Sequence, residues 1–353
     1  MISQSLHADT VLPQRMLIAG GMGGTNVGES LLRAAVSLGI HAELVNTRDA
    51  YTGNRIWRWL NWYLRDKRPA NQREFEQKLL RACDSHKPEV LLTTGLAPLS
   101  KPVLAQIRQR GTRCINYLTD DPWNPAHRAG WFLQALPLYD LVCTPRKAMI
   151  EDLRSVGCQH IRYVPFAYDE SLFFAPAAAD VAAANAVPAS DVMFAGGADP
   201  DRVPYMRALI DAGFDLALYG DYWTRHPAVS AIARGIADVA TVRVAIVKAK
   251  VSLCLVRRAN RDGNCMRTFE VPAVGGCMLV EDTAEHREIF GEEGINVLYF
   301  NDLASMIDKT RQLCSDDTLR QRLAGNCHRL MQTGGHTYRD RLLSMLHPAG
   351  AML

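Results

Sequence analysis

Residues 267–281, with the sequence RTFEVPAVGGCMLVE, decide the fold of this chain. A short helix with one acidic residue is followed by two glycines that end it, and then by an apolar strand. A strand that is apolar at every position, after a glycine-terminated helix, is typical of a parallel sheet buried on both faces. The stretch 283–290, TAEHREIF, predicts the next helix. This region is therefore expected to be an α/β domain.

The start of the first of these helices brings together Arg267, Thr268 and Glu270. A helix N-terminus beside an arginine can bind a diphosphate, and a neighbouring carboxylate can accept hydrogen bonds from ribose hydroxyls. These residues therefore predict a nucleotide-sugar site. The alternative is that Glu270 only complements the helix dipole.

The composition narrows the class of protein. The 353 residues carry 40 Lys and Arg against 37 Asp and Glu, a net charge of +3, which gives no reason to expect a nucleic-acid partner. There is no run of about eighteen apolar residues, and residues 1–11 are polar and mixed, so we expect neither a membrane span nor a secretory signal. The nine scattered cysteines form no C-x-x-C pair, which favours reduced thiols in a cytoplasmic protein.

The first half of the chain alternates strands with helices, which predicts a doubly wound parallel sheet. The expected strands are 15–19, 41–45, 90–94, 114–118, 141–143 and 161–165, and the expected helices are 27–38, 75–83, 102–110 and 148–156.

A second α/β pattern begins after residues 176–190, a stretch of mostly Ala, Pro, Asp and Val that we interpret as a linker or insertion. Its strands are expected at 192–195, 216–219, 251–255 and 277–280, with a helix around 204–212. We predict an N-terminal domain over 1–175, a C-terminal domain over 191–335, and a last helix within 336–353 that returns to the first domain. The fold class is then two doubly wound, Rossmann-like domains facing a cleft.

The C-terminal half resembles the donor-binding half of GT-B glycosyltransferases of the group 1 superfamily, in particular the spore-maturation-protein (CgeB-like) type. The residues that carry this resemblance extend over most of 191–346: they are 194–197, 218–223, 267–276, 283–290, 297–303 and 336–341. The N-terminal half resembles the family only in architecture.

The resemblance implies transfer of a sugar, a hexose by expectation, from a nucleotide-diphosphate sugar to a hydroxyl-bearing acceptor: a small molecule, glycan, lipid or protein. It also implies no cofactor and no metal, because basic side chains and helix dipoles neutralise the leaving diphosphate. Many members carry two glutamates separated by seven residues; here Asp262 takes the first position and Glu270 the second. The donor-binding residues are then expected to be Gly196, Gly197, Gly220, Tyr222, Arg257, Asp262, Arg267, Thr268, Phe269 and Glu270. Trp223 beside Tyr222 could stack on the base or simply pack.

Two features of the N-terminal half could take part in the chemistry. Gly21, Gly23, Gly24, Thr25 and Asn26 follow the first strand and could approach the sugar or acceptor, or form only a tight turn. The third glycine of a dinucleotide fingerprint is missing, so an NAD-dependent oxidoreductase is only an alternative.

Asp120 and Asp121 follow a buried strand, where one of them could act as general base; capping before a proline is the other interpretation.

Residues 54–68, NRIWRWLNWYLRDKR, form a basic, aromatic helix. Its apolar stripe could contact an anionic membrane or line an acceptor site, although such a stripe usually belongs to a core. We therefore expect a cytoplasmic protein, with peripheral contact at the inner membrane face as an option. A GT-B protein that binds nucleotide sugar or glycan without turnover is the remaining alternative.

Overall fold

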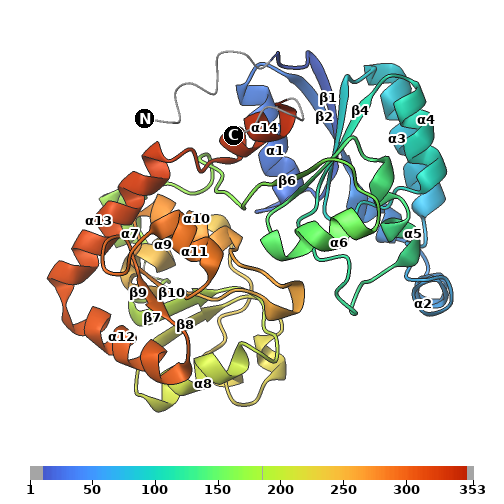
Figure 1. Cartoon of the computed structure of the whole chain (residues 1–353). Coiled ribbons are helices and arrows are strands. Elements are labelled where there is room, and N and C mark those ends of the chain that lie inside the picture. Colours follow the sequence, from blue (N-terminus) through green and yellow to red (C-terminus); the bar gives the residue numbers. More distant parts are fainter. Residues whose placement is uncertain (1–10, 185, 348–353) are drawn as a thin grey trace. The chain divides into compact units, whose positions relative to one another are not determined.

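The computed structural model describes residues 11–184 and 186–347 and divides into two compact units (Figure 1). Unit 1 comprises Met1–Pro165, Ala259–Arg261 and Tyr338–Leu353, and unit 2 comprises Phe166–Arg258 and Asp262–Thr337. Residues 1–10, for which we expected no secretory signal, and residues 348–353 lie outside the described ranges.

Unit 1 is built on a parallel sheet of strand order β2-β1-β3-β4-β5-β6. The central strands are apolar and buried on both faces, as the sequence predicts. The bounds are β1 Arg15–Gly20, β2 His41–Asn46, β3 Val90–Thr94, β4 Arg113–Tyr117, β5 Leu141–Thr144 and β6 Ile161–Tyr163.

The helices of unit 1 connect these strands and cover the sheet (Figure 1). They are α1 Val27–Ser37, α2 Arg55–Leu64, α3 Gln72–His86, α4 Lys101–Gln109, α5 Gly130–Leu133, α6 Ile150–Ser155 and α14 Tyr338–Leu346. The last of them, α14, packs on α1, so the chain returns to unit 1 at its C-terminal end.

Unit 2 repeats the architecture with the strand order β11-β10-β9-β7-β8, again parallel. The bounds are β7 Ser190–Ala195, β8 Leu216–Tyr219, β9 Ala249–Cys254, β10 Met278–Glu281 and β11 Leu298–Phe300. The two parallel sheets with their flanking helices confirm the predicted α/β class with two doubly wound domains.

The helices of unit 2 are α7 Ala178–Ala183, α8 Val203–Asp211, α9 Val239–Lys248, α10 Met266–Val274, α11 Ala284–Phe290, α12 Leu303–Ser315 and α13 Asp317–Thr333. The sequence analysis placed α8, α10 and α11 but not α9, α12 or α13. Gly275 adopts the left-handed conformation, φ +95°, that ends α10, as the double glycine predicts.

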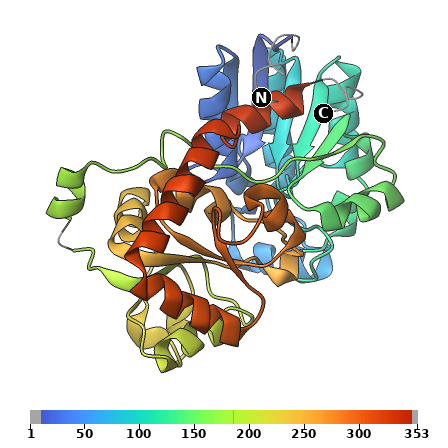
Figure 2. The same cartoon turned by 60° about the vertical axis from the view of Figure 1, so that its left-hand side comes forward.

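The stretch 176–190 belongs to unit 2 together with residues 166–175. Helix α7 has no buried residue and stands out from the rest of the unit (Figure 2), as expected for a stretch with little to pack. Val187, however, is buried in the core of unit 2, and Lys248 donates to its carbonyl oxygen over 2.9 Å. The segment is therefore attached at its end rather than solvent-exposed throughout.

All nine cysteines are free thiols. Within the described ranges no helix is both long enough and apolar enough to span a membrane.

Candidate functional site

The carboxyl ends of β7, β8, β9 and β10 lie along one edge of the sheet of unit 2, because the strands are parallel. Ligands of open parallel sheets bind at such an edge. The loops after β7 and β8 are joined by two backbone hydrogen bonds, Gly196 N to Tyr219 O over 3.0 Å and Ala198 N to Asp221 O over 2.9 Å. Most of the predicted donor-binding residues lie along this edge.

Gly220 is required by the close approach of these two loops. Its φ is +135°, and a Cβ there would lie 2.0 Å from the carbonyl oxygen of Gly196. Gly197 has no such restriction, since its nearest neighbours would be 3.8 Å or more from a Cβ. Gly220 therefore shapes the edge, while Gly197 leaves space beside it.

The two aromatic residues after β8 differ in exposure. Trp223 is 1% exposed, stacks edge-on against Phe194, and donates from Nε1 to the carbonyl oxygen of Gly196 over 2.8 Å. Its role is packing, and the idea that Trp223 could stack on a base is wrong. Tyr222 is 47% exposed, with the Arg225 guanidinium 4.4 Å from its ring centre, so it is the aromatic side chain available to a ligand.

A buried arginine that the sequence analysis missed braces the loop after β7. Arg202 donates to the carbonyl oxygens of Gly197 over 3.0 Å and Leu255 over 3.4 Å, and its guanidinium lies over the ring of Phe194. Its charge is balanced by Asp199, 3.3 Å away. A lone arginine immediately before α8 carried no sequence signal for this role.

Arg257 and Arg258 follow β9, and both face carboxylates. Arg257 lies 3.8 Å from Asp199, and Arg258 lies 3.2 Å from Glu281 and donates to the Tyr205 hydroxyl over 2.7 Å. The side chain of Arg257 is 43% exposed. It can therefore turn toward an anionic ligand without uncovering buried surface.

The first turn of α10 contains Arg267 and Glu270, which are predicted to bind the donor. Arg267 forms an ion pair with Glu270 and donates to the carbonyl oxygen of Ala195 over 3.0 Å, which ties the helix to the end of β7. Glu270 is 1% exposed and Phe269 is fully buried in the core. Phe269 thus anchors α10, while Arg267 and Glu270 supply the polar groups.

A buried hydrogen-bond relay fixes the start of α10 against β10. The backbone N–H of Cys265 donates to Thr268 Oγ1 over 3.0 Å, and Thr268 Oγ1 lies 2.9 Å from His286 Nε2. Nδ1 of His286 lies 2.7 Å from the carbonyl oxygen of Glu281. Since a carbonyl can only accept, Nδ1 carries the proton and Nε2 accepts from the Thr268 hydroxyl.

His286 is neutral in this relay. Burial lowers the pKa of His286 to about 4, against the opposing effects of the hydrogen bond to Glu281 and of the Asp282 charge. Protonation would give Nε2 a hydrogen where it now accepts one. Thr268 therefore positions the helix rather than facing a ligand with its hydroxyl.

The loop before α10 contains Asp262, whose backbone N–H donates to the carbonyl oxygen of Arg257 over 3.2 Å. The next residue, Gly263, is needed because a Cβ there would lie 2.0 Å from the Glu285 carboxylate. Asp262 is half-buried between these anchors.

An acidic D-x-D triplet, Asp199-Pro200-Asp201, follows β7. Of the features at this edge, it argues most strongly against the prediction that the protein needs no metal. Asp199 is engaged by Arg202, whose backbone N–H donates to Oδ1 over 3.0 Å. Over the described residues, no group of three or more His, Cys, Asp or Glu side chains is placed to hold a metal ion.

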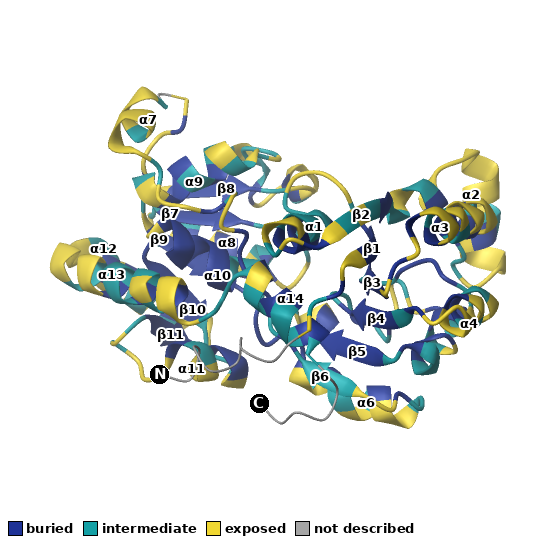
Figure 3. Cartoon of the chain, turned by 90° about the horizontal axis from the view of Figure 1, so that it is seen from above, coloured by how far each residue is buried: buried dark blue, intermediate teal, exposed yellow. Residues whose placement is uncertain are grey.

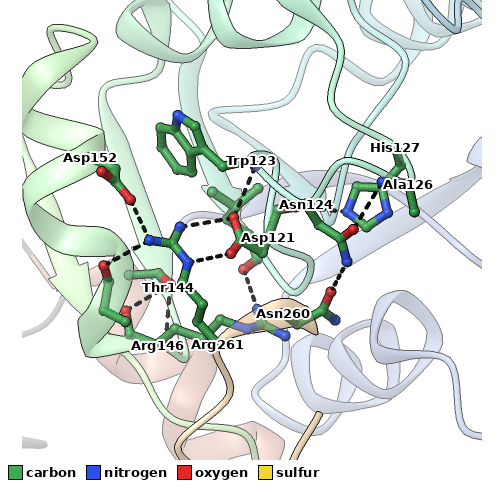
Figure 4. A network of polar contacts seen from close by, with 12 residues as sticks. Asp121, Trp123, Asn124, Ala126, His127, Thr144, Arg146, Asp152, Asn260 and Arg261 are labelled. Atoms are coloured by element: carbon green, nitrogen blue, oxygen red, sulfur yellow. Dashed lines mark hydrogen bonds and ion pairs between the residues drawn. The ribbon is translucent and has the colours of Figure 1, made fainter. Parts of the chain in front are cut away.

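In unit 1 the carboxyl edge of the sheet holds the two aspartates after β4, and they differ. Asp121 is 2% exposed and is bound by Arg261, with Nε 2.6 Å from Oδ2 and Nη2 3.1 Å from Oδ1 (Figure 4). Oδ1 also accepts from the Trp123 backbone N–H over 2.9 Å. Both oxygens of Asp121 are thus engaged, and the hydrogen bond to Asp121 raises the pKa of Arg261.

Asp120 is half-buried and lies against Gly95, where a Cβ would be 2.9 Å from Oδ2. Gly95 adopts a left-handed conformation, φ +60°, at the end of β3. No ion pair of Asp120 is found among the described residues. Its carboxylate is therefore better placed than that of Asp121 to accept a proton.

The glycine loop after β1 is an exposed turn into α1. Gly23 and Gly24 have φ of +87° and +58°, and a Cβ on either would meet nothing within 4 Å. Asn26 caps α1 by backbone geometry, and its Oδ1 accepts from Arg48 over 3.4 Å.

Gly20 and Gly28, which the sequence analysis did not single out, make the close contact between β1 and α1. A Cβ on Gly20 would lie 2.8 Å from the Cα of Gly28.

Comparisons with known proteins agree with the fold. Residues 202–347 match the family model described as glycosyl transferase-like. Among curated proteins, none matches the sequence.

Solved structures with a similar fold include sucrose-phosphate synthase from Thermosynechococcus elongatus, 14% identical with TM-score 0.68, over 94% of this chain and 97% of that one. Anabaena HepE in complex with UDP-glucose is 12% identical with TM-score 0.63, over 94% and 98% of the two chains. A UDP-forming trehalose-phosphate synthase from Burkholderia xenovorans is 12% identical with TM-score 0.61, over 97% and 100%. Together these solved structures show that the chain has the GT-B fold.

Proposed function

We propose that this protein transfers a sugar, a hexose, from a nucleotide-diphosphate sugar to a hydroxyl-bearing acceptor. The observation that carries the proposal is the Arg267–Glu270 pair in the first turn of α10, at the carboxyl edge of a GT-B sheet. This turn lies within the region that matches the glycosyl transferase-like model. The CgeB-like type is part of the proposal and rests on the resemblance of the sequence.

The donor would be held by charge and hydrogen bonding in unit 2. Glu270 accepts from the ribose hydroxyls, and Arg267 and Arg257 face the diphosphate together with the N-terminus of α10. Tyr222 offers an exposed aromatic face to the base. Because Arg267 now pairs with Glu270, a diphosphate would give this guanidinium a second anionic partner.

The leaving diphosphate gains negative charge as the glycosidic bond breaks. Fixed positive groups at that position stabilise the transition state more than the ground state. Arg267 and Arg257 can supply this charge, which is why we propose that transfer is independent of a metal and needs no cofactor. Asp199 at the D-x-D triplet is then a partner of the arginines.

The acceptor chemistry would take place at the edge of unit 1. In an inverting reaction, Asp120 would take the proton of the acceptor hydroxyl as the hydroxyl oxygen attacks the anomeric carbon. The exposed turn at Gly23 and Gly24 allows the acceptor or sugar to approach the backbone. Asp121 would keep this loop in place through Arg261.

UDP-sugars are the first donors to test, because HepE has been solved in complex with UDP-glucose, and separately with UDP and glucose. The nine free thiols favour the cytoplasm as the location of this enzyme.

The test is release of nucleoside diphosphate from a panel of UDP-, GDP- and dTDP-hexoses, in the presence and absence of candidate acceptors. The Glu270→Gln variant removes the carboxylate charge and replaces one of its two acceptor oxygens by a donor, and Glu292→Gln, exposed in the same unit, is the matched control. We expect release with one donor class, retained in Glu292→Gln and lost in Glu270→Gln.

Other outcomes decide between the alternatives. Tight donor binding without hydrolysis or transfer across the panel would favour the non-catalytic nucleotide-sugar or glycan-binding protein. Binding of NAD with no response to any nucleoside diphosphate would contradict the proposal and favour the oxidoreductase.

A further inference from the structure

Helix α2 turns its polar residue inward and its apolar stripe outward. Asn61 is its buried residue, 4% exposed, whereas Ile56, Trp59 and Tyr63 on the stripe are 68%, 57% and 67% exposed. In a helix that packs on a core, the residues at this spacing face the core. An apolar stripe at this spacing usually belongs to a core, but in α2 it is exposed. Figure 3 shows α2 largely exposed beside α3.

The exposed residues are the types that prefer the boundary between water and lipid. Trp57 and Trp62 are 59% and 37% exposed, and Leu64 at the end of the helix is 71% exposed. The rings of Trp59 and Tyr63 lie 5.3 Å apart and form one surface. Trp and Tyr combine an apolar ring with a hydrogen-bonding group and are enriched where one side is apolar and the other wet.

Basic side chains surround this surface without acidic partners. Helix α2 contains no Asp or Glu, and the carboxylate of Asp66, just after it, accepts from the backbone N–H groups of Gly130 and Trp131 over 2.6 and 3.2 Å. No ion pair is formed within the described part of the chain by the basic residues of this segment, which are Arg55, Arg58, Arg65, Lys67 and Arg68. The segment therefore presents uncompensated positive charge.

Part of this charge lines a hollow next to the aromatic surface. A cavity of about 370 Å³ is lined by Arg55, Arg58, Arg68, Trp59, Trp62 and Tyr63. Arg68 is held in place by the ring of Trp131, 5.5 Å from its guanidinium. Three guanidinium groups around one hollow complement an anionic head group, with aromatic rings beside it for the apolar part.

We propose that α2 is a peripheral membrane-binding element that lies in the surface of an anionic lipid bilayer. The stripe of Ile56, Trp59 and Tyr63 enters the head-group region, and the arginines bind lipid phosphates. A second copy of the chain fits this surface less well, since a two-fold contact would bring two uncompensated basic patches together. The proposal concerns unit 1 alone and does not depend on the proposed transfer reaction.

The test is flotation of the full chain with vesicles of phosphatidylcholine alone and of phosphatidylcholine mixed with phosphatidylglycerol, at low and high salt. We expect flotation with the anionic vesicles, weakened by salt, and little with the neutral ones. The double variant Trp59→Ala, Tyr63→Ala should reduce the partition coefficient at least about tenfold. Because these side chains are exposed, thermal unfolding should stay close to that of the wild type.

Matched controls remove residues of similar type outside α2 and so test whether the location of the residue matters. Ile236→Ala removes an even more exposed apolar side chain from unit 2, and Arg154→Gln removes an exposed cation from α6; neither should change flotation. Arg55→Gln with Arg58→Gln should remove the preference for anionic vesicles.

The proposal is overturned by absence of flotation, by equal flotation of the Trp59→Ala, Tyr63→Ala variant, or by equal flotation with both vesicle types. If the protein does not float but forms a concentration-dependent dimer that this variant abolishes, the partner of α2 is a second copy of the chain and not a bilayer. UDP binding measured on the same samples reports on the proposed transferase separately, so either proposal can fail alone.

Discussion

The carboxyl edges of the two sheets are constructed differently. In unit 2, buried polar groups hold the segments at this edge in place. Arg202 binds the loop after β7, and Thr268 and His286 fix the start of α10. In unit 1 the ion pair of Asp121 with Arg261 holds the loop after β4, but the same edge also carries an exposed glycine turn and the half-buried Asp120. Under the proposed function, this difference means that the edge of unit 2 would be formed before the donor arrives, while the exposed turn of unit 1 would leave room for an acceptor.

The family match follows the same division, since it covers residues 202–347 and none of the loops at the edge of unit 1 apart from Arg261 and its neighbours. Under the proposed function, the matched region would bind the donor, whose diphosphate presents the same charges to every enzyme that uses it. An acceptor differs from one enzyme to the next.

The largest effect is expected from a substitution at the carboxyl edge of unit 1. Asp120→Asn should lower the rate of donor cleavage about a thousandfold, because general base catalysis typically contributes between about 10² and 10⁴. Donor affinity should be unchanged, since Asp120 lies in unit 1. Steady-state kinetics with calorimetric donor binding checks both parts.

Asp121→Asn is the matched comparison for this prediction. It weakens the pair with Arg261, whose side chain is 38% exposed, so we expect a loss of stability of about 1 kcal/mol and a smaller loss of rate. The assignment of the base to Asp120 would be contradicted if Asp121→Asn abolished turnover in a folded protein while Asp120→Asn did not.

The next prediction compares a glycine at each edge. Gly220→Ala places a Cβ 2.0 Å from the Gly196 carbonyl oxygen at φ +135° and should destabilise the protein by roughly 4 kcal/mol. Gly23→Ala meets only open space at φ +87° and should cost about 1 kcal/mol, from backbone strain alone. Urea unfolding measures both, and equal losses would argue against a braced edge in unit 2.

The pH dependence of stability tests the His286 relay. The folded-state pKa of His286 is lowered to about 4, so between about pH 6.5 and pH 4 the unfolded chain binds a proton that the folded chain does not. The contribution of this histidine to the free energy of unfolding is therefore complete at neutral pH. It falls by about 1.4 kcal/mol per pH unit as the pH drops through that window.

His286→Gln should remove that part of the slope, as seen in urea unfolding at neutral and acidic pH. His160→Gln, at an exposed position in unit 1, should leave the slope unchanged. Equal slopes in the wild type and His286→Gln would mean that the histidine is not buried in its neutral form.

Much of the fold could be predicted from the sequence because strands and glycine-ended helices leave local patterns. The strands expected at 90–94 and 216–219 have the observed bounds, and α10 ends at the predicted glycines. Helices α9, α12 and α13 were missed. Helix α9 is apolar on most sides, which hides its period, since Val242, Val244, Ala245 and Ile246 are all buried.

The candidate site could be predicted only where its residues are neighbours in the sequence. Arg267 and Glu270 lie one turn apart, so their pairing follows from the helix. Arg261 and Asp121 are 140 positions apart, and nothing local to either residue indicates that the chain returns to unit 1 at Ala259–Arg261. Likewise, the period of α2 predicts an apolar face but not whether protein covers it.

The most direct test of the central claim, that the first turn of α10 binds the donor nucleotide, is calorimetric titration of UDP into the wild type and Glu270→Gln, with Glu292→Gln as control. The account predicts binding by the wild type and the control, and a loss of affinity of about ten- to a hundredfold in Glu270→Gln, because a hydrogen bond to a charged group contributes about 1.5–3 kcal/mol. Unchanged UDP affinity in a folded Glu270→Gln protein would contradict it.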